Sequence, residues 1–152
     1  MHPYRLVTNW RLAAPIEPVW EALYDVTAWP RWWKYVLAVE TVEPGDACGV
    51  GAVQRYTWAS RLPYRLSFNM RSTLVQPPQR LAGEAQGELN GTGLWTLNSL
   101  GAMTHVRYNW EVSTSRAWMN ALAPVLAPAF RWNHGQVMAE GERGLARYLA
   151  AR

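Results

Sequence analysis

The sequence predicts an α+β fold in which a curved antiparallel sheet of about six to seven strands grips one long C-terminal helix. Three observations predict it. The C-terminal stretch carries apolar residues at helical spacing, the middle of the chain carries a series of strand-like segments, and two short helices follow the first strand. An antiparallel sheet with one apolar face needs a cover for that face, and the terminal helix is the only predicted element long enough to provide it.

The stretch from Ser115 to Arg152 is predicted to form this long helix. If each residue advances by about 100°, one stripe of residues lies within about 40° of a single line, so this stripe must face the core. It consists of Leu126, Phe130, Asn133, Val137, Gly141, Gly144 and Tyr148. The residues that point away from it, toward solvent, are charged: Arg131, Glu142, Arg143 and Arg147.

Two prolines interrupt the first half of this helix. Pro124 and Pro128 each remove a backbone amide donor and clash with the preceding turn. We therefore expect Trp118 to Ala127 to be a separate or kinked piece.

The N-terminal region is predicted to hold one strand and two short helices. Tyr4 to Leu12 alternates loosely and suits a strand. The prolines on either side of Glu17 mark a helix start, because first-turn amides need no partner there and the helix dipole favours an acid; this helix ends near Asp25. Thr27 to Trp33 forms a second brief helix or turn, whose three tryptophans are expected to plug one end of the core.

Six further segments are predicted to complete the sheet. Asn90-Gly91 is interpreted as a hairpin turn, because both residues of a tight hairpin turn must accept positive φ. The predicted strands are Val36 to Glu43, Gly51 to Ser60, Tyr64 to Val75, Arg80 to Leu89, Thr92 to Leu100 and Met103 to Thr114.

Composition limits the class of protein. A length of 152 residues favours one domain, 1–152, and the single cysteine, Cys48, cannot form an internal disulfide. No apolar run is long enough to span a bilayer, and no apolar run follows a basic segment at the N-terminus, so we expect a cytoplasmic protein without stable membrane insertion. The net charge of +4 comes almost wholly from arginines that are scattered, which argues against nucleic acid as a partner. The oligomeric state stays open.

The ten tryptophans are the unusual feature of the composition. Each needs a large apolar environment and a partner for its indole N–H. So many in a short chain indicate either a very aromatic core or a cavity with aromatic walls.

Several runs of residues resemble those of one known family. They are Val19-Trp20-Glu21, Asp25, Trp29-Pro30-Arg31-Trp32-Trp33, the stretch from Gly87 to Trp95, Phe130-Arg131-Trp132-Asn133-His134, Val137-Met138 and Gly141. Together they resemble the polyketide cyclase/dehydrase-like branch of the START/Bet v 1-like (SRPBCC) superfamily, over essentially the whole chain. The resemblance implies the helix-grip fold with a deep hydrophobic cavity between the sheet and the long helix. Its members include carriers of lipids and other apolar ligands as well as polyketide aromatases and cyclases.

Candidate residues for chemistry are His134, Tyr108 and Tyr56. His134 lies about 60° from the centre of the helical stripe, where its imidazole reaches the cavity edge as an acid or base or simply bonds a loop. Tyrosines on the concave face would hold or polarise a ligand oxygen. Burying an unpaired amide costs roughly 1 to 3 kcal/mol, so Asn133 is expected to bond a strand residue, a water or a ligand.

The remaining candidates are expected to form the walls of the cavity. They are Trp58, Phe68, Met70, Trp95, Trp110, Trp118, Phe130, Asn133 and Val137. Alternation places Arg55 and Glu111 on the opposite face, whereas the orientation of Glu84 and Glu88 stays open because neighbouring glycines permit a bulge.

Other chemistries are not supported by the sequence. Three histidines and one cysteine without ligand spacing do not indicate a metal site, and neither a phosphate-binding glycine loop nor a G-x-S-x-G motif is present. No cofactor is expected.

These observations favour binding of a small hydrophobic ligand, such as a lipid, an isoprenoid or a polyketide-like molecule, in the cavity. The first alternative is a polyketide cyclase, aromatase or dehydratase that uses the same cavity, since positioning alone supplies much of such catalysis. The second is an interaction or stress-related module with a solid core and no ligand.

Overall fold

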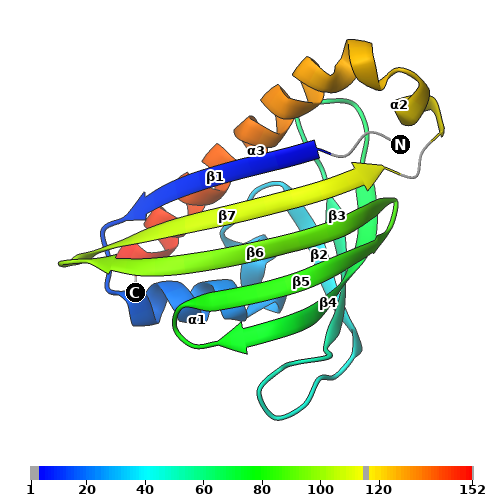
Figure 1. Cartoon of the computed structure of the whole chain (residues 1–152). Helices are drawn as coiled ribbons and strands as arrows, with labels where there is room; N and C mark the ends of the chain where they lie inside the picture. The colour runs from blue at the N-terminus through cyan, green and yellow to red at the C-terminus, as the bar shows by residue number, and fades with distance from the viewer. Residues whose placement is uncertain (1–3, 115–116, 152) are drawn as a thin grey trace.

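The computed structural model describes residues 4–114 and 117–151 (Figure 1). The helices are α1 (Ile16–Tyr24), the 3₁₀ helix η1 (Val26–Arg31), α2 (Ala117–Ala121) and α3 (Ala123–Ala150). The strands are β1 (Tyr4–Leu12), β2 (Val36–Glu43), β3 (Val53–Trp58), β4 (Leu66–Gln76), β5 (Arg80–Gly87), β6 (Leu89–Leu100) and β7 (Met103–Thr114). The predicted order of elements is confirmed.

The strands form one antiparallel sheet in the order β1-β7-β6-β5-β4-β3-β2. The first strand pairs with the last, so that Tyr4 lies opposite Val112 and Leu12 opposite Thr104. The sheet curves, and α3 lies across one of its faces while α1 and η1 cover one end (Figure 1). This is the predicted α+β helix-grip architecture with seven strands.

Alternation along the strands separates the two faces of the sheet as expected. On β7, Val106, Trp110 and Val112 are buried, whereas Glu111 is exposed. Glu111 pairs across the outer face with Arg5 of β1 at 3.5 Å. The apolar face of the sheet therefore looks toward α3 along its length.

The predicted hairpin between β5 and β6 is present, but its turn centres on Glu88 and not on Asn90-Gly91. Gly87 takes the positive φ of 126°, and no residue other than glycine has a positive φ among those described. The Asn90 side chain stabilises this turn, because its Nδ2 donates a hydrogen bond to the Gly87 carbonyl at 3.1 Å. Gly91 already pairs within β6, where a Cβ would strike the carbonyl oxygen of Glu111. The glycine thus serves a close approach of two strands.

The C-terminal helix is broken, but earlier than expected. The predicted start at Ser115 lies outside the described residues, and α2 ends at Ala121. The long helix begins at Ala123, so the separate piece does not extend to Ala127 as predicted. Pro124 lies in the first turn of α3, where no intrahelical donor is required, and α3 continues through Pro128.

The predicted stripe of α3 faces the sheet. Asn133, Val137, Gly141 and Gly144 are buried, whereas Arg131, Arg143 and Arg147 on its back are exposed. Glu142, predicted to point to solvent, is half-buried and accepts a hydrogen bond from the Arg11 amide at 2.9 Å. None of the described helices is long and apolar enough to cross a membrane.

Candidate ligand cavity

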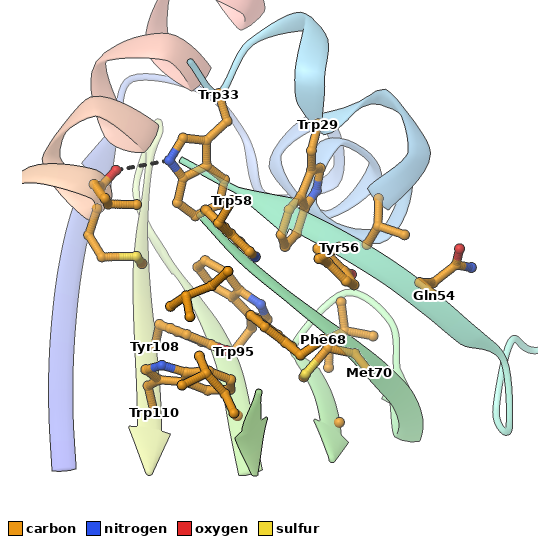
Figure 2. A pocket seen from close by; sticks show the side chains of 18 of the residues that line it. Trp29, Trp33, Gln54, Tyr56, Trp58, Phe68, Met70, Trp95, Tyr108 and Trp110 are labelled. Atoms are coloured by element: carbon orange, nitrogen blue, oxygen red, sulfur yellow. Dashed lines mark hydrogen bonds between the residues drawn. The ribbon is translucent and has the colours of Figure 1, made fainter. Parts of the chain in front are cut away.

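A cavity of about 730 Å³ lies between the sheet and the helices. Residues of β1, β3 to β7, α1, η1 and α3 line it, as does the β3–β4 connection. Side chains from two walls of the sheet point into it (Figure 2). The fold therefore encloses a space between sheet and helix, in addition to a solid core.

The first wall belongs to β3 and β4 and is a set of nearly parallel rings. The Tyr56 ring stacks beside Trp58 with centroids 6.3 Å apart and an interplanar angle of 8°. It also stacks beside Phe68, its partner across the strands, at 6.0 Å and 10°. Because side chains two residues apart on a strand share a face, the alternation of β3 and its register with β4 bring these rings together.

The second wall belongs to β6 and β7. Trp95 lies opposite Tyr108 in the register, and their rings stack with centroids 4.1 Å apart at 26°. The Tyr108 ring stacks in turn beside Trp110 at 5.7 Å and 23°. The hydroxyl of Tyr108 lies over Gly93, where any Cβ would collide with it. A glycine at this position is what allows the hydroxyl to reach its place.

The third side is α3, which contributes Phe130, Asn133, His134 and Val137. Asn133 is 7% exposed, and its Oδ1 has no hydrogen-bond partner among the described residues. Burial lowers the pKa of His134 to about 4, because the charged imidazolium would lose its hydration. At neutral pH this imidazole is therefore uncharged.

The phenols of Tyr56 and Tyr108 stay protonated in this environment. Burial raises the pKa of Tyr56, and for Tyr108 burial is the main cause of a raised pKa, to which the nearby Tyr56 adds. Among the described residues neither hydroxyl has a hydrogen-bond partner. Both phenols can therefore donate to, or accept from, a bound molecule.

The cavity residues contribute further unpaired donors, the Tyr4 hydroxyl and the Trp58 indole. Trp58 Nε1 is buried and has no hydrogen-bond partner among the described residues. Two adjacent indoles are satisfied: Trp33 Nε1 donates to the Val137 carbonyl at 2.9 Å, and Trp29 Nε1 donates to the Ala22 and Leu23 carbonyls at 3.2 Å. Trp58 thus differs from its neighbours in pointing its N–H at no protein acceptor.

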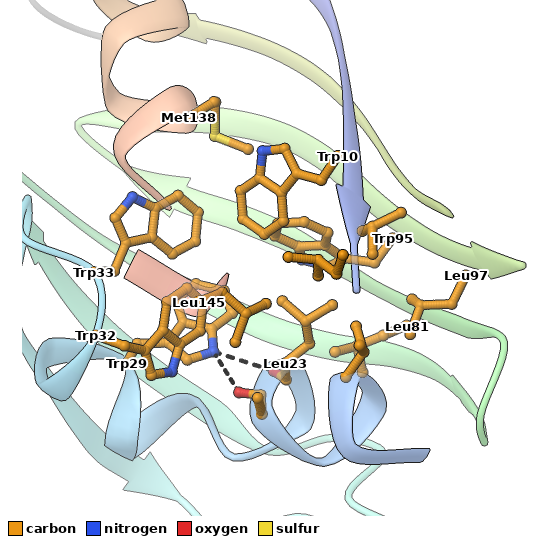
Figure 3. Packing of buried hydrophobic residues seen from close by; sticks show 14 of the residues in the cluster. Trp10, Leu23, Trp29, Trp32, Trp33, Leu81, Trp95, Leu97, Met138 and Leu145 are labelled. Atoms are coloured by element: carbon orange, nitrogen blue, oxygen red, sulfur yellow. Dashed lines mark hydrogen bonds between the residues drawn. The ribbon is translucent and has the colours of Figure 1, made fainter. Parts of the chain in front are cut away.

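One end of the space between sheet and helix is filled by tryptophans (Figure 3). The Trp10 ring contacts Trp33 at 5.4 Å and Trp95 at 5.3 Å between centroids. Trp29, Trp32 and Trp33 are all buried, so the predicted plug is confirmed. Two glycines of α3 admit it: a Cβ on Gly141 would lie 2.5 Å from the Trp33 ring, and one on Gly144 would overlap the Trp32 carbonyl.

A connecting loop borders the cavity near the start of α3. Tyr64, in the connection between β3 and β4, packs edge-to-face against Phe130 with ring centroids 6.2 Å apart. In the same connection, the guanidinium of Arg61 lies over the ring of Trp132 in α3, 5.7 Å from its centroid. The two contacts hold the loop against the helix. At the other side, Tyr24 donates a hydrogen bond to the Cys48 carbonyl at 3.1 Å.

The structure brings the predicted site residues together. His134, Tyr108 and Tyr56 all line the cavity, as do Trp58, Phe68, Met70, Trp95, Trp110, Phe130, Asn133 and Val137. The side chain of Trp118, which was also predicted there, lies outside the described part of the chain.

The structure shows the orientation of Glu84 and Glu88, which the sequence left undetermined. Glu84 is exposed on the outer face. Glu88 accepts a hydrogen bond from the Ser67 amide at 2.6 Å, and neither glutamate lines the cavity. No cluster of His, Cys, Asp or Glu within the described residues could hold a metal ion.

Sequence reasoning missed several lining residues. Gln54 precedes Tyr56 and Trp58 at the same two-residue spacing, so strand alternation could have found it. Tyr64 lies in an irregular connection, where no periodicity signals its direction. Trp29 and Trp33 were assigned only to the core, yet they also border the cavity.

Comparisons with known proteins agree with this geometry. The model of the family described as "Polyketide cyclase / dehydrase and lipid transport" matches residues 5–150. No curated protein matches the chain in sequence.

Solved structures show the same fold at low identity. A START superfamily protein from Mycobacterium smegmatis has a TM-score of 0.79 and 12% identity, covering 97% of this chain and 97% of that one. A protein from Thermus thermophilus has a TM-score of 0.77 and 16% identity, covering 97% and 99%. The Zhui aromatase/cyclase from Streptomyces sp. R1128 has a TM-score of 0.65 and 20% identity, covering 93% and 95%.

The family model spans nearly the whole chain, and the fold is that of the START/Bet v 1-like proteins. This chain therefore belongs to the family of polyketide cyclases, dehydrases and lipid-transport proteins.

Proposed function

We propose that this protein binds a small hydrophobic molecule in the cavity between the sheet and α3. The observation that carries the proposal is a space of about 730 Å³ whose walls are mostly apolar and rich in aromatic side chains. Ligand pockets typically measure about 300 to 1,000 Å³ and combine apolar walls with a few placed polar groups. The space is large enough for a lipid-like or polycyclic molecule.

The sheet and helix hold this space open by their own packing. The rings of each wall stack on one another at separations of 4.1 to 6.3 Å, and a tilted contact between Phe68 and Trp110, with centroids 6.0 Å apart, joins the two walls. Collapse would require these stacked rings to leave their neighbours. A preformed apolar cavity gains free energy when a ligand replaces the missing contacts.

Native mass spectrometry of the freshly purified protein, compared with its denatured mass, tests the proposal. We expect a stoichiometric extra mass that is released on denaturation. Met70→Trp should abolish it, because the larger ring projects from β4 into the cavity. Val7→Trp is the matched control, since Val7 is 54% exposed on β1 and the same new ring lies outside.

The measurement has a clear negative outcome. If wild type, Met70→Trp and Val7→Trp all lack extra mass, and if added hydrophobic ligands bind the three proteins equally weakly, the cavity is no binding site. Equal retention of ligand by wild type and Met70→Trp would place the ligand elsewhere on the protein.

A polyketide cyclase, aromatase or dehydratase is the second candidate function, and a specific set of groups favours it. The neutral imidazole of His134 can accept a proton, while Tyr56 and Tyr108 can donate hydrogen bonds to a carbonyl or enolate oxygen. Turnover of a poly-β-ketone thioester by wild type, His134→Gln and Tyr108→Phe tests this role. Unchanged turnover in both variants would contradict it.

A ligand-free module is the least supported function. It fits a solid core, whereas the space between sheet and helix is only partly filled by tryptophans. The cavity volume weighs against it.

A further inference from the structure

We propose that the cavity selects an uncharged ligand that carries a hydroxyl group and discriminates against carboxylates and other anions. This inference rests on the proposed binding function and specifies the chemical class of its ligand. It follows from the charges at the cavity wall and from the unpaired polar atoms of the lining residues.

The cavity offers no cation to an anionic ligand. Among the described residues that line it there is no lysine or arginine, and the charged ones are Glu21 and Asp25, both acids. A buried carboxylate needs a positive charge as its counter-ion, and the described wall provides none. Without a cation, the effective desolvation of a carboxylate costs several kcal/mol, which an apolar wall cannot return.

The histidine does not supply the missing charge. His134 lines the cavity, but burial lowers its pKa to about 4, so its imidazole is neutral at physiological pH. An anion would have to raise that pKa by several units before it gained a partner. The cavity is thus neutral in its polar groups and weakly negative at its α1 end.

Unpaired polar atoms of the lining residues, which include the Tyr4 hydroxyl, specify what the ligand must offer. Asn133 Oδ1 is buried and can only accept a hydrogen bond, whereas Trp58 Nε1 is buried and can only donate one. The hydroxyls of Tyr56 and Tyr108 do both. A hydroxyl is the smallest neutral group that both donates and accepts, so it can satisfy an acceptor such as the amide oxygen or a donor such as the indole N–H.

The cost of leaving a buried polar group unpaired is large enough to discriminate between ligands with and without a hydroxyl. A buried polar group without a partner costs about 1 to 3 kcal/mol, and a ligand hydroxyl that reaches Asn133 removes part of this cost. A ligand without the hydroxyl leaves it in place. We therefore expect an alcohol to bind about five- to tenfold more tightly than the parent hydrocarbon.

Three ligands with one carbon skeleton test the inference. They are pyrene, 1-pyrenemethanol and 1-pyrenecarboxylic acid, titrated with the full chain at pH 7.5 while pyrene fluorescence anisotropy is followed. We expect the alcohol to bind most tightly, the hydrocarbon about five- to tenfold more weakly, and the carboxylate at least about tenfold more weakly than the alcohol.

Variants locate the preference. Asn133→Leu should bring the alcohol and the hydrocarbon to within about twofold of each other while hydrocarbon binding persists. Trp58→Phe keeps a ring in the wall and removes the N–H, so it should also reduce the difference in affinity between the alcohol and the hydrocarbon. Asn98→Leu is the matched control, since Asn98 is exposed on β6 and the same substitution there should leave the order of affinities unchanged.

The outcomes separate this inference from the proposed function. Equal affinities for the three ligands, or tighter binding of the carboxylate, would overturn the selection for uncharged hydroxylated ligands while leaving hydrophobic binding intact. Absence of binding by all three would overturn the proposed function and the inference with it. A preference for the alcohol that Asn133→Leu and Trp58→Phe leave unchanged would overturn the assignment to these two atoms.

Discussion

The space between the sheet and α3 is filled at one end and open at the other, although aromatic residues occupy both ends. At the packed end, defined by Trp10, Trp33 and Leu145, the side chains are 1%, 1% and 0% exposed. At the cavity end, defined by Phe130, Asn133 and His134, side chains of the same helix border a space of about 730 Å³. Aromatic content alone does not decide between core and cavity.

The difference follows from the residues that α3 presents to each end. Gly141 and Gly144 let the Trp33 ring and the Trp32 backbone touch the helix surface. Two to three turns earlier the helix carries Phe130 and Asn133, whose side chains separate it from the sheet. Glycines close the space between two layers, and large side chains hold it open.

The largest expected effect comes from removing a glycine contact at the packed end. Gly144→Ala should lower the free energy of unfolding by about 3 kcal/mol, because the added methyl overlaps the Trp32 carbonyl and the segment carrying three tryptophans must shift. Gly135→Ala is the control on the same helix, where nothing lies within 4 Å of the new methyl. It should raise stability by about 0.5 to 1 kcal/mol through helix propensity. Urea denaturation measures both, and equal effects of the two variants would contradict this account.

The second largest expected effect is the pH dependence of stability that His134, at the cavity end, produces. His134 has a pKa of about 4 in the folded protein against 6.5 as the ordinary value, so the unfolded chain binds a proton that the folded one does not. This contribution to stability is fully present above about pH 6.5 and is lost as the pH falls toward 4. Between pH 7 and pH 5 the free energy of unfolding should fall by about 2 kcal/mol.

His134→Gln should flatten this part of the stability profile. Chemical denaturation at each pH measures it, and the window stops at pH 5 because the pKa of Glu140, lowered by a hydrogen bond from Arg143, lies below its ordinary value. A His134→Gln profile that falls as steeply as that of wild type would rule out His134 as the source.

The smallest expected effect is the difference in stability loss between the same substitution made at each of the two ends. Trp33→Phe should cost about 2 to 3 kcal/mol, because it leaves a void in a filled region and removes the hydrogen bond to the Val137 carbonyl. Trp110→Phe should cost about 1 kcal/mol, since the space it leaves joins an existing cavity. Thermal and urea unfolding of both variants measure the difference. A larger loss for Trp110→Phe would show that the cavity wall carries more packing energy than the plug.

Much of the cavity could be predicted from the sequence because strand alternation is a local property. Tyr56, Phe68, Tyr108 and Trp110 lie on the inner face for the same reason that Glu111 lies outside. The helical stripe of α3 likewise placed Asn133 and Val137. Residues in irregular connections, such as Tyr64, carry no such signal, and they were missed.

The errors had physical causes that lie beyond the local sequence. Asn90-Gly91 has the composition of a tight turn, but its glycine is needed where β6 approaches β7. A proline in the interior of a helix disrupts it, but in the folded protein the long helix begins one residue before Pro124. This proline therefore lies in the first turn, where it is tolerated.

The sequence by itself determined the order of elements, the two faces of the sheet and the buried stripe of α3, because periods of two and 3.6 residues are properties of the backbone. Only the tertiary structure decided which aromatic side chains fill space and which enclose it. That choice depends on the distance between α3 and each part of the sheet, and therefore on contacts such as that of Gly144 with Trp32, 112 positions apart in the chain. It likewise decided that Asn133 and Trp58 lack partners among the described residues, since a hydrogen bond needs two groups to meet and the sequence shows only one at a time.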